Sequence, residues 1–399
     1  MGPYYKTHGA HNATTMKITL DSFLLLTFLW LTAACQPKQK VDYIIHNVRL
    51  FDGVEVREEV SVVVDDGKIV DITSEIGRYI AEEVIEAGGY TIIPPLIDAH
   101  VHISSLAQLH ASLREGVFAV VDLHSPPGVA NKLKASRDSF LHASLLSSGP
   151  ALTVAGGHGT QFGAPIPTVT KEREPRTFVA DRVKEGADLL KIIREPMLPT
   201  LDYETIGALI KASHQFDKLA VGHISTAGDA TKISELGIDV VSHIWLDRKM
   251  TDEELSLLQE KKPFVIPTLL VTRELLQFRE KQGGANHYLP FQDIRQEVNR
   301  LHKAGITLLA GTDAPNLGLK FGESLITEMK LLVSVGLSET EALKTATVKP
   351  IQAFGLDQNL LPRRGHSANF ILVEGNPTVD ITSLQKIKEV WVMGKRTKK

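Results

Sequence analysis

The chain has 399 residues, of which 43% are hydrophobic, and its formal net charge is -3. This length and composition exclude a disordered chain and suit one large folded domain with a smaller companion. Basic residues are scattered apart from a short run at 395–399, so nothing in the charge pattern indicates a nucleic-acid partner.

The first 35 residues have the order of an export signal. Met16 and Lys17 precede an apolar run, FLLLTFLWL at 23–31, and the sequence TAAC then ends at the single cysteine, Cys35. A positive start, an apolar middle and small residues before a cleavage point are typical of secretory signals. The stretch resembles a bacterial lipoprotein signal, which implies lipidation of Cys35 and a protein anchored in the periplasm or at the cell surface. A plain secreted protein and a single anchoring helix are the alternatives, although the run is shorter than the about 20 residues that span a bilayer.

Residues 36–93 are expected to be a polar tether followed by half of a small β domain. Short alternating segments occur there, and Asp-Gly pairs at 52–53 and 66–67 fit tight hairpin turns. A similar pattern of short strand-like segments occurs within 356–399, in ANFILVEGN and EVWVMGKR. We therefore predict that these two remote segments pair into one small β-sandwich domain.

Residues 94–355 repeat one pattern, a helical stretch that ends at glycine and is followed at once by an apolar strand. LREGVFAVVDL and VKEGADLLKII are two examples. Such repeats imply parallel strands with helical crossovers. The pattern predicts an α/β fold, a (β/α)8 TIM-like barrel, with an open doubly wound sheet as the alternative. That alternative is disfavoured because no glycine-rich phosphate fingerprint follows the first strand. The eight strands are expected around 96–102, 117–123, 151–155, 188–193, 219–223, 239–243, 264–268 and 306–312.

The ends of these strands carry side chains suited to metal chemistry. In a barrel of this kind the active site lies at the carboxyl ends of the strands. His100 and His102 are two apart on a strand, so their imidazoles project to the same side, as two ligands of one metal require. Lys191 lies in the apolar run ADLLKIIRE, where an unpaired ammonium is unfavourable. It therefore needs either a route to water or a function.

Several ordered motifs resemble the metal-dependent amidohydrolase superfamily, in a branch with dipeptidases and imidazolonepropionase. Imidazolonepropionase itself fits less well, because it uses one metal and lacks the strand-four lysine. The similarity covers nearly the whole chain after the signal. The matching features are IDAHVH, GADLLKI, a histidine pair 20 residues apart (His223 and His243), LLAGTDA, GLSETEALKTATVKPIQAFGL and RGHSANFILVEGNP.

The resemblance implies a site for two divalent metal ions. Lys191 would react with carbon dioxide and bridge the ions as a carbamate, whereas the alternative is a lysine that extends from the strand end into the barrel mouth. Asp313 would be the catalytic acid and base. Zinc is the favoured ion for oxygen and nitrogen ligands, with manganese, cobalt or iron as alternatives. The implied ligands are His100, His102 and Asp313 for one ion, His223 and His243 for the other, and Lys191 between them.

Substrate contacts are expected at three further positions. His158 lies in AGGHGTQFG, a glycine-rich loop similar to one in dipeptidase-like members, although a simple turn is the alternative. Several dipeptidases have a tyrosine where this chain has Ser225, so recognition of a free carboxylate by that route is in doubt. Arg194 and Arg248 lie just beyond strand ends and could take its place.

The expected function is hydrolysis of a C–N bond in a small amide, cyclic amide or dipeptide, by a hydroxide that bridges the metals. A lactonase or phosphotriesterase-like esterase is one alternative, since the same hydroxide attacks esters. A non-catalytic binding protein is another, which the six filled metal-site positions argue against. The expected partner is a small-molecule substrate, with membrane contact only through a lipid anchor, and the habit of the superfamily implies a homo-oligomer.

Overall fold

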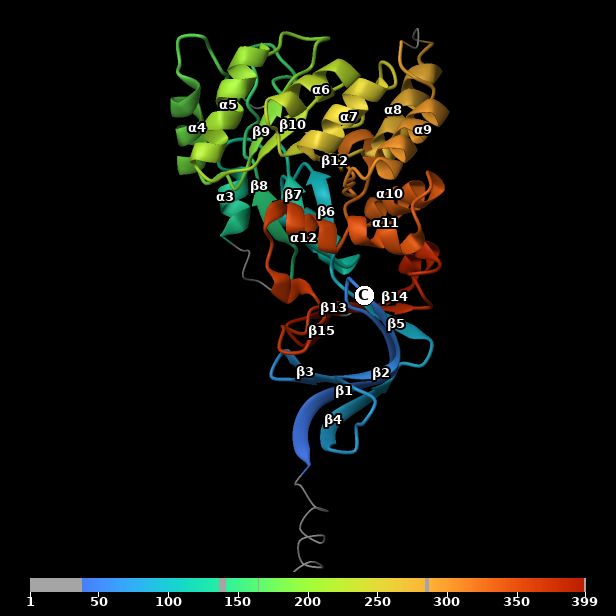
Figure 1. Cartoon of the computed structure of the whole chain (residues 1–399). Coiled ribbons are helices and arrows are strands. Elements are labelled where there is room, and N and C mark those ends of the chain that lie inside the picture. The colour runs from blue at the N-terminus through green and yellow to red at the C-terminus, as the bar shows by residue number, and fades with distance from the viewer. Residues whose placement is uncertain (1–37, 136–140, 164, 284–286, 398–399) are drawn as a thin grey trace, which may run out of the picture.

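The computed structural model describes residues 38–135, 141–163, 165–283 and 287–397. The signal-like segment and Cys35 lie outside the described residues. Within the described ranges, no helix is both long enough and apolar enough to cross a membrane. Figure 1 shows a curved sheet at one end of the molecule and a larger part built of alternating strands and helices at the other.

The curved sheet joins the two ends of the chain. Strand β5 pairs antiparallel with β13, and Ile92 lies opposite Leu372 at this junction. The sequence predicts a sandwich, and the structure places all eight strands in one hydrogen-bonded sheet, in which the long strand β1 is visibly bent (Figure 1). The order is β15-β14-β13-β5-β1-β2-β3, with β4 beside β1. The bounds are β1 (Gln39–Phe51), β2 (Val56–Asp65), β3 (Lys68–Thr73), β4 (Tyr79–Glu86), β5 (Tyr90–Ile93), β13 (Phe370–Glu374), β14 (Ile387–Val392) and β15 (Lys395–Thr397).

The larger part contains two parallel sheets, with the orders β6-β7-β8 and β12-β11-β10-β9. Helices lie around these strands (Figure 1). Glycines end helices as the sequence predicts, and Gly116 and Gly237 adopt φ of 78° and 89°, where a side chain would be strained. The strands are β6 (Leu96–Val101), β7 (Val117–Asp122), β8 (Ser144–Ser147), β9 (Leu190–Ile193), β10 (Ala220–His223), β11 (Val240–Ser242) and β12 (Phe264–Ile266).

The helices of the larger part follow the strands in chain order. They are α2 (Leu106–Arg114), α3 (Val129–Lys134), α4 (Pro175–Lys184), α5 (Tyr203–Gln215), α6 (Ala227–Glu235), α7 (Asp252–Lys261), α8 (Leu269–Lys281), α9 (Phe291–Lys303), α10 (Glu323–Ser334), α11 (Glu339–Thr345) and α12 (Val348–Phe354). Short 3-10 helices are η1 (Asn316–Gly318), η2 (Gln358–Leu360) and η3 (Ile381–Lys386).

Two predicted strands differ from the observed ones. The third strand forms earlier than predicted, as β8, and Pro150 follows it; residue Leu152 makes only an isolated bridge to Ile192. The segment 306–312 likewise makes an isolated bridge, from Leu308 to Val265, rather than a named strand. The N–H of Gly149 donates to the hydroxyl of Ser147 at 2.9 Å, and Pro150 has no N–H to donate, so the ladder of β8 does not continue into the predicted strand.

The segment 306–314 nevertheless lies between the two parallel sheets. The N–H of Leu309 donates to the carbonyl of Val265 on β12 at 2.9 Å, and the N–H of Ala99 on β6 donates to the carbonyl of Ala310 at 3.0 Å. A Cβ at Gly311 would lie 2.9 Å from the backbone nitrogen of His100, so the two chains are in close contact there. One buried apolar cluster includes Ala99, Val121, Val221, Val240, Ile266 and Leu309, which come from β6, β7, β10, β11, β12 and this segment.

Candidate metal-binding active site

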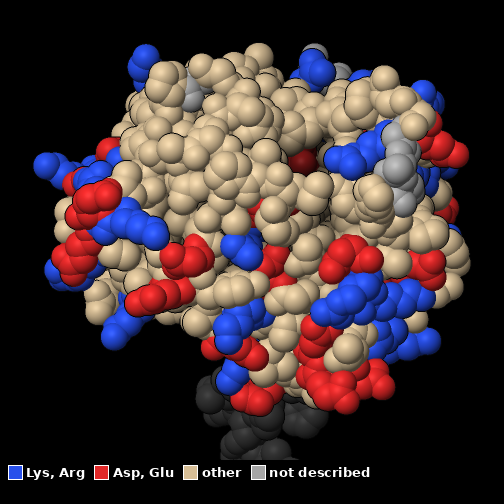
Figure 2. Space-filling model, turned by 90° about the horizontal axis from the view of Figure 1, so that it is seen from above, with Lys and Arg blue, Asp and Glu red and all other residues tan. Residues whose placement is uncertain are grey.

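A cavity of about 550 Å³ lies at the carboxyl ends of the parallel strands. In the space-filling view its opening is a hollow with acidic atoms at the bottom, and most of the surrounding surface is uncharged (Figure 2). The structure brings all six residues predicted as metal ligands to the wall of this cavity, together with His158. The six are His100, His102, Lys191, His223, His243 and Asp313.

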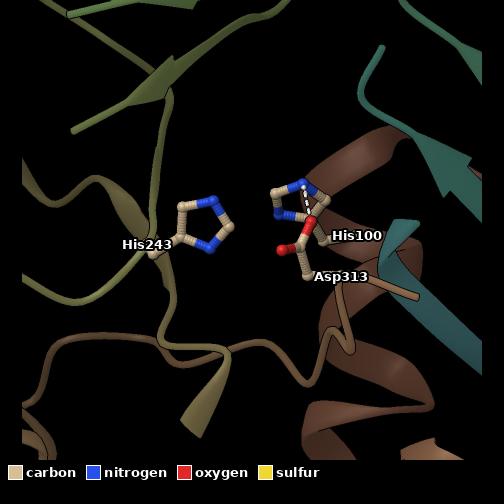
Figure 3. Close-up of side chains that lie close together, drawn as sticks. All are labelled: His100, His243 and Asp313. Atoms are coloured by element: carbon tan, nitrogen blue, oxygen red, sulfur yellow. Dashed lines mark ion pairs between the residues drawn. The ribbon is translucent and has the colours of Figure 1, made fainter. Parts of the chain in front are cut away.

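Three of these residues lie close enough to share one ion. The ligand atoms of His100, His243 and Asp313 lie within 4.8 Å of one another, and their side chains converge in Figure 3. The rings of His100 and His243 stack with centroids 4.7 Å apart. Oδ1 of Asp313 lies 3.3 Å from Nε2 of His100, and that nitrogen is buried and has no hydrogen-bond partner among the described residues. A buried nitrogen without a partner beside a carboxylate fits the chemistry of a metal ligand.

The ring orientation of three histidines is set by contacts to Nδ1. The carbonyl oxygen of His124 can only accept, so Nδ1 of His102, 3.1 Å away, carries a proton. With Nδ1 engaged, Nε2 is the atom left to bind a ligand, as is usual for metal-binding histidines. Hydroxyl groups hold the other two rings: Oγ of Ser242 lies 2.8 Å from Nδ1 of His100, and Oγ1 of Thr268 lies 2.7 Å from Nδ1 of His243.

The protonation states of these groups suit metal binding. Burial lowers the pKa of His100 and His243 well below the ordinary value, so both rings are neutral. Burial would raise the pKa of Asp313, but its charge interaction with His100 and its hydrogen bond with His102 hold that pKa well below the ordinary value. Burial would lower the pKa of His102, yet the bond to Asp313 raises it. The site therefore combines two neutral imidazoles, those of His100 and His243, with an ionised carboxylate that is hydrogen-bonded to His102.

Lys191 lies on β9 and is only 2% exposed. Burial lowers the pKa of its ammonium group to about 7, against the opposing influence of the Asp313 and Asp122 carboxylates. Among the described residues, no carboxylate lies within ion-pair distance of its Nζ. A lysine with a depressed pKa is partly neutral near neutral pH, and a neutral amine can act as a nucleophile.

His223 ends β10 and connects the cluster to a second group of side chains. Its ring stacks on His158 with centroids 4.5 Å apart and lies edge-on to His243 at 5.0 Å. Oε2 of Glu195 lies 3.8 Å from Nε2 of His223, and Oε1 accepts a hydrogen bond from Ser225 at 3.1 Å. Glu195 was not among the residues expected from the sequence. Its position, four residues after Lys191 at the end of the same strand, was the signal that could have identified it.

The structure does not bring Arg194 or Arg248 to the cavity wall. Nε of Arg194 donates to Oδ1 of Asp229 at 2.9 Å. Arg248 donates two hydrogen bonds to Glu254, each of 2.6 Å. Both guanidinium groups therefore already have carboxylate partners within the chain.

A different arginine, Arg279 on α8, lines the cavity, as does Asn316 on η1. Nδ2 of Asn316 donates to Oδ2 of Asp313 at 3.0 Å. Neither residue belongs to a motif, and both reach the cavity only through the packing of their elements.

Asp98 is close to the proposed ligands in sequence but has a different set of contacts. Its carboxylate accepts hydrogen bonds from the backbone N–H and the hydroxyl of Thr312, at 3.0 and 2.7 Å.

The chain belongs to the Amidohydrolase family, whose family model matches residues 91–397. This range includes every residue of the site described above. The match therefore agrees with the superfamily resemblance that the strand-end motifs predict.

Among curated proteins, adenine deaminase of Geobacillus kaustophilus is 25% identical over 380 residues, which are 89% of this chain and 58% of that protein. Ochratoxinase of Aspergillus niger is 23% identical over 306 residues, 66% of this chain and 62% of that protein. The chain thus spans about three fifths of the length of these relatives. Among solved structures, a Xaa-Pro dipeptidase with bound methionine has 22% identity and a TM-score of 0.74, over 90% of this chain and 100% of that one, which shows a shared fold.

Proposed function

We propose that this chain is a metal-dependent hydrolase that cleaves a C–N bond in a small amide, cyclic amide or dipeptide. Membership of the Amidohydrolase family supports a hydrolase of this class. The observation that carries the proposal is the convergence of His100, His243 and Asp313 in a cavity that also contains the buried Lys191. A purely structural core does not require such a set of nitrogen and oxygen donors at the ends of parallel strands.

The proposed ligands suit two divalent ions, with His100, His102 and Asp313 around one ion and His223 and His243 around the other. The ligand atom of His243 also lies within 4.8 Å of those of His100 and Asp313, so the two proposed groups are neighbours in the cavity. A nitrogen and oxygen set without thiolate suits zinc, and also manganese, cobalt or iron. Lys191 would join the two ions after carboxylation by carbon dioxide, which requires the neutral amine that burial favours. Ions bound there would lower the pKa of a water molecule and polarise the scissile carbonyl group.

Asp313 is the proposed acid and base. The side-chain amide of Asn316 fixes its Oδ2, which leaves Oδ1 beside the histidines. Because the carboxylate is ionised, it can accept a proton from the attacking water and then donate it to the leaving nitrogen. Amide hydrolysis needs this second transfer more than ester hydrolysis does, because an amine leaves poorly without a proton.

The fold proposed around this site is a closed (β/α)8 barrel over 94–355, with 36–93 and 356–399 forming the small β domain. Support comes from the three isolated parallel bridges that join the two parallel sheets to each other and to the 306–314 segment. The buried cluster shared by strands of both sheets supports the same interpretation. Export and lipidation at Cys35 remain predictions from the sequence.

The test is a substrate screen with the purified full-length protein loaded with zinc. It would be incubated with pooled dipeptides, N-acyl amino acids, cyclic amides and lactones, and the addition of water would be scored by mass spectrometry. Asp313→Asn serves as the blank. We expect amide members to be hydrolysed by the wild type alone. Turnover of lactones only would instead support the esterase, and no turnover with metal bound would support a binding protein.

The carbamate has its own test in Lys191→Ala. We expect this variant to bind fewer than two metal ions per chain and to lose nearly all activity, with partial recovery when short carboxylic acids are added. Wild-type metal content and turnover in Lys191→Ala would refute the bridging role.

A further inference from the structure

The mouth of the cavity carries a group of exposed apolar side chains. Phe162, Met197, Leu198 and Leu317 line the cavity and are 56%, 75%, 40% and 44% exposed. Single exposed apolar residues are ordinary on protein surfaces, but several around one cavity are typical of a ligand site. The largely uncharged surface around the hollow in Figure 2 agrees with this group. The mouth of the cavity therefore suits a ligand with an apolar part.

Arg279 is the one arginine among the described residues that line this cavity. It lies in the last turn of α8, and its guanidinium carbon is 4.5 Å from the centroid of the Tyr288 ring, which also lines the cavity. In the part of the chain that the structure describes, Arg279 forms no ion pair with a carboxylate. Arg273 on the same helix does pair, with Glu274 at 2.9 Å. The guanidinium group of Arg279 therefore lies against the face of the Tyr288 ring, and its charge is not paired with a carboxylate of the described residues.

Lys191 is the other lysine or arginine among the described residues of the lining, but it does not offer a charge at the mouth of the cavity. It is buried among the histidines, whereas Arg279 is exposed at the mouth. Among the described lining residues, Arg279 is therefore the cation that the outer end of a ligand would meet if the ligand reached from the metal-binding cluster to the mouth. The two arginines expected from the sequence, Arg194 and Arg248, are occupied by Asp229 and Glu254.

We propose that Arg279 binds an anionic group of the substrate, so that the enzyme selects small amides carrying an apolar part and a carboxylate or similar anion. This inference rests on the proposed function. A guanidinium fork matches a carboxylate with two parallel hydrogen bonds, and stacking on Tyr288 holds its plane in place. The apolar side chains of the mouth would cover the rest of the ligand and exclude water from this pair.

The test uses two probes that cannot be hydrolysed and differ in charge. 4-Phenylbutanoate has an apolar ring and a carboxylate, and 4-phenylbutan-1-ol has the same ring with a neutral end. Binding of each to the zinc-loaded full-length protein would be measured by calorimetry for the wild type, Arg279→Gln, Arg279→Lys and the control Arg273→Gln. We expect Arg279→Gln to weaken binding of the anion about tenfold or more and to change binding of the alcohol little. Arg279→Lys should restore part of the loss, and Arg273→Gln should match the wild type.

Three outcomes would overturn the inference. They are failure of 4-phenylbutanoate to bind the wild type, an unchanged preference for the anion in Arg279→Gln, and equal weakening of both probes, which would show a structural role. Binding is measured without turnover, so the two proposals fail separately. Selective binding through Arg279 without hydrolysis of any amide would refute only the proposed function. Hydrolysis that is indifferent to Arg279 and to the charge of the substrate would refute only this inference.

Discussion

Oγ1 of Thr268 lies 2.7 Å from Nδ1 of His243. The same hydroxyl lies 2.8 Å from the carbonyl oxygen of Pro267, which can only accept a hydrogen bond. When the hydroxyl donates its single proton to Pro267, it must accept from Nδ1 of His243. This arrangement puts the ring proton on Nδ1 and leaves the lone pair of Nε2 free for a metal ion.

Replacing Thr268 with valine should therefore weaken metal binding although Thr268 is not itself a ligand. Valine keeps the branched shape that the buried site and its unusual backbone, with φ of 45°, already accommodate. The loss of the Nδ1 contact should lower metal affinity by about 10- to 100-fold. Competition with a chromophoric chelator would measure it. Thr268→Ser should retain the affinity, and Thr347→Val, which removes a buried hydroxyl bonded to the Leu343 carbonyl, is the matched control. Wild-type affinity in Thr268→Val would contradict the orienting role.

Glu328 on α10 should make the stability of the protein depend on pH. Its buried carboxyl accepts hydrogen bonds from the N–H groups of Leu269 and Leu270, at 2.9 and 2.7 Å, where α8 begins. Burial raises the pKa of Glu328 from 4.5 to about 8, against these hydrogen bonds. The folded state therefore holds a proton that the unfolded state releases, and the stabilising contribution of this group falls as pH rises between those values.

Glu328→Gln cannot ionise, so its stability should fall less than that of the wild type between about pH 5 and about pH 8. Urea unfolding at both pH values gives the free energy of unfolding of each protein. The quantity compared is the change in that free energy between the two pH values, and not the absolute stability of the variant. Glu260→Gln, at an exposed position on α7, should keep the wild-type dependence. The same change with pH in Glu328→Gln and the wild type would show that Glu328 is ionised throughout.

The alternation of side chains along β9 separates what the sequence could predict from what it missed. Lys191 was identified because a charged group stands out in an apolar run, and Glu195 has the same parity at the end of that strand. Arg194 has the opposite parity, so its side chain turns toward Asp229 on α6 and away from the cavity. If the alternation of side chains had been considered beyond the end of β9, Glu195 would have been expected at the cavity in place of Arg194.

Arg279 and Asn316 illustrate what no local pattern could supply. Arg279 lies on an exposed helical position, which is where arginine is ordinarily found, and only the packing of α8 brings it to the cavity. The fold shows the same contrast. The glycine stops and the strands with histidines were predictable. The isolated bridges of the 306–312 segment and its close approach to His100 at Gly311 depend on tertiary contacts that no local pattern indicates.

Lys191→Met should make the metal-free protein more stable while it removes the proposed bridging ligand. In the folded chain the pKa of Lys191 is about 7, below its ordinary value of 10.5, so the fold penalises the charged form. Methionine is of similar length and carries no charge, so we expect a gain of about 1 to 4 kcal/mol in the free energy of unfolding. The unfolded state binds the extra proton between those two pKa values, so the penalty is complete below pH 7 and disappears as pH rises toward 10.5. Urea unfolding after chelation should show that the stability advantage of Lys191→Met over the wild type shrinks across that pH range. Lys211→Met, on the exposed face of α5, is the control. If Lys191→Met were less stable than the wild type at every pH, Lys191 would have a stabilising partner in the fold.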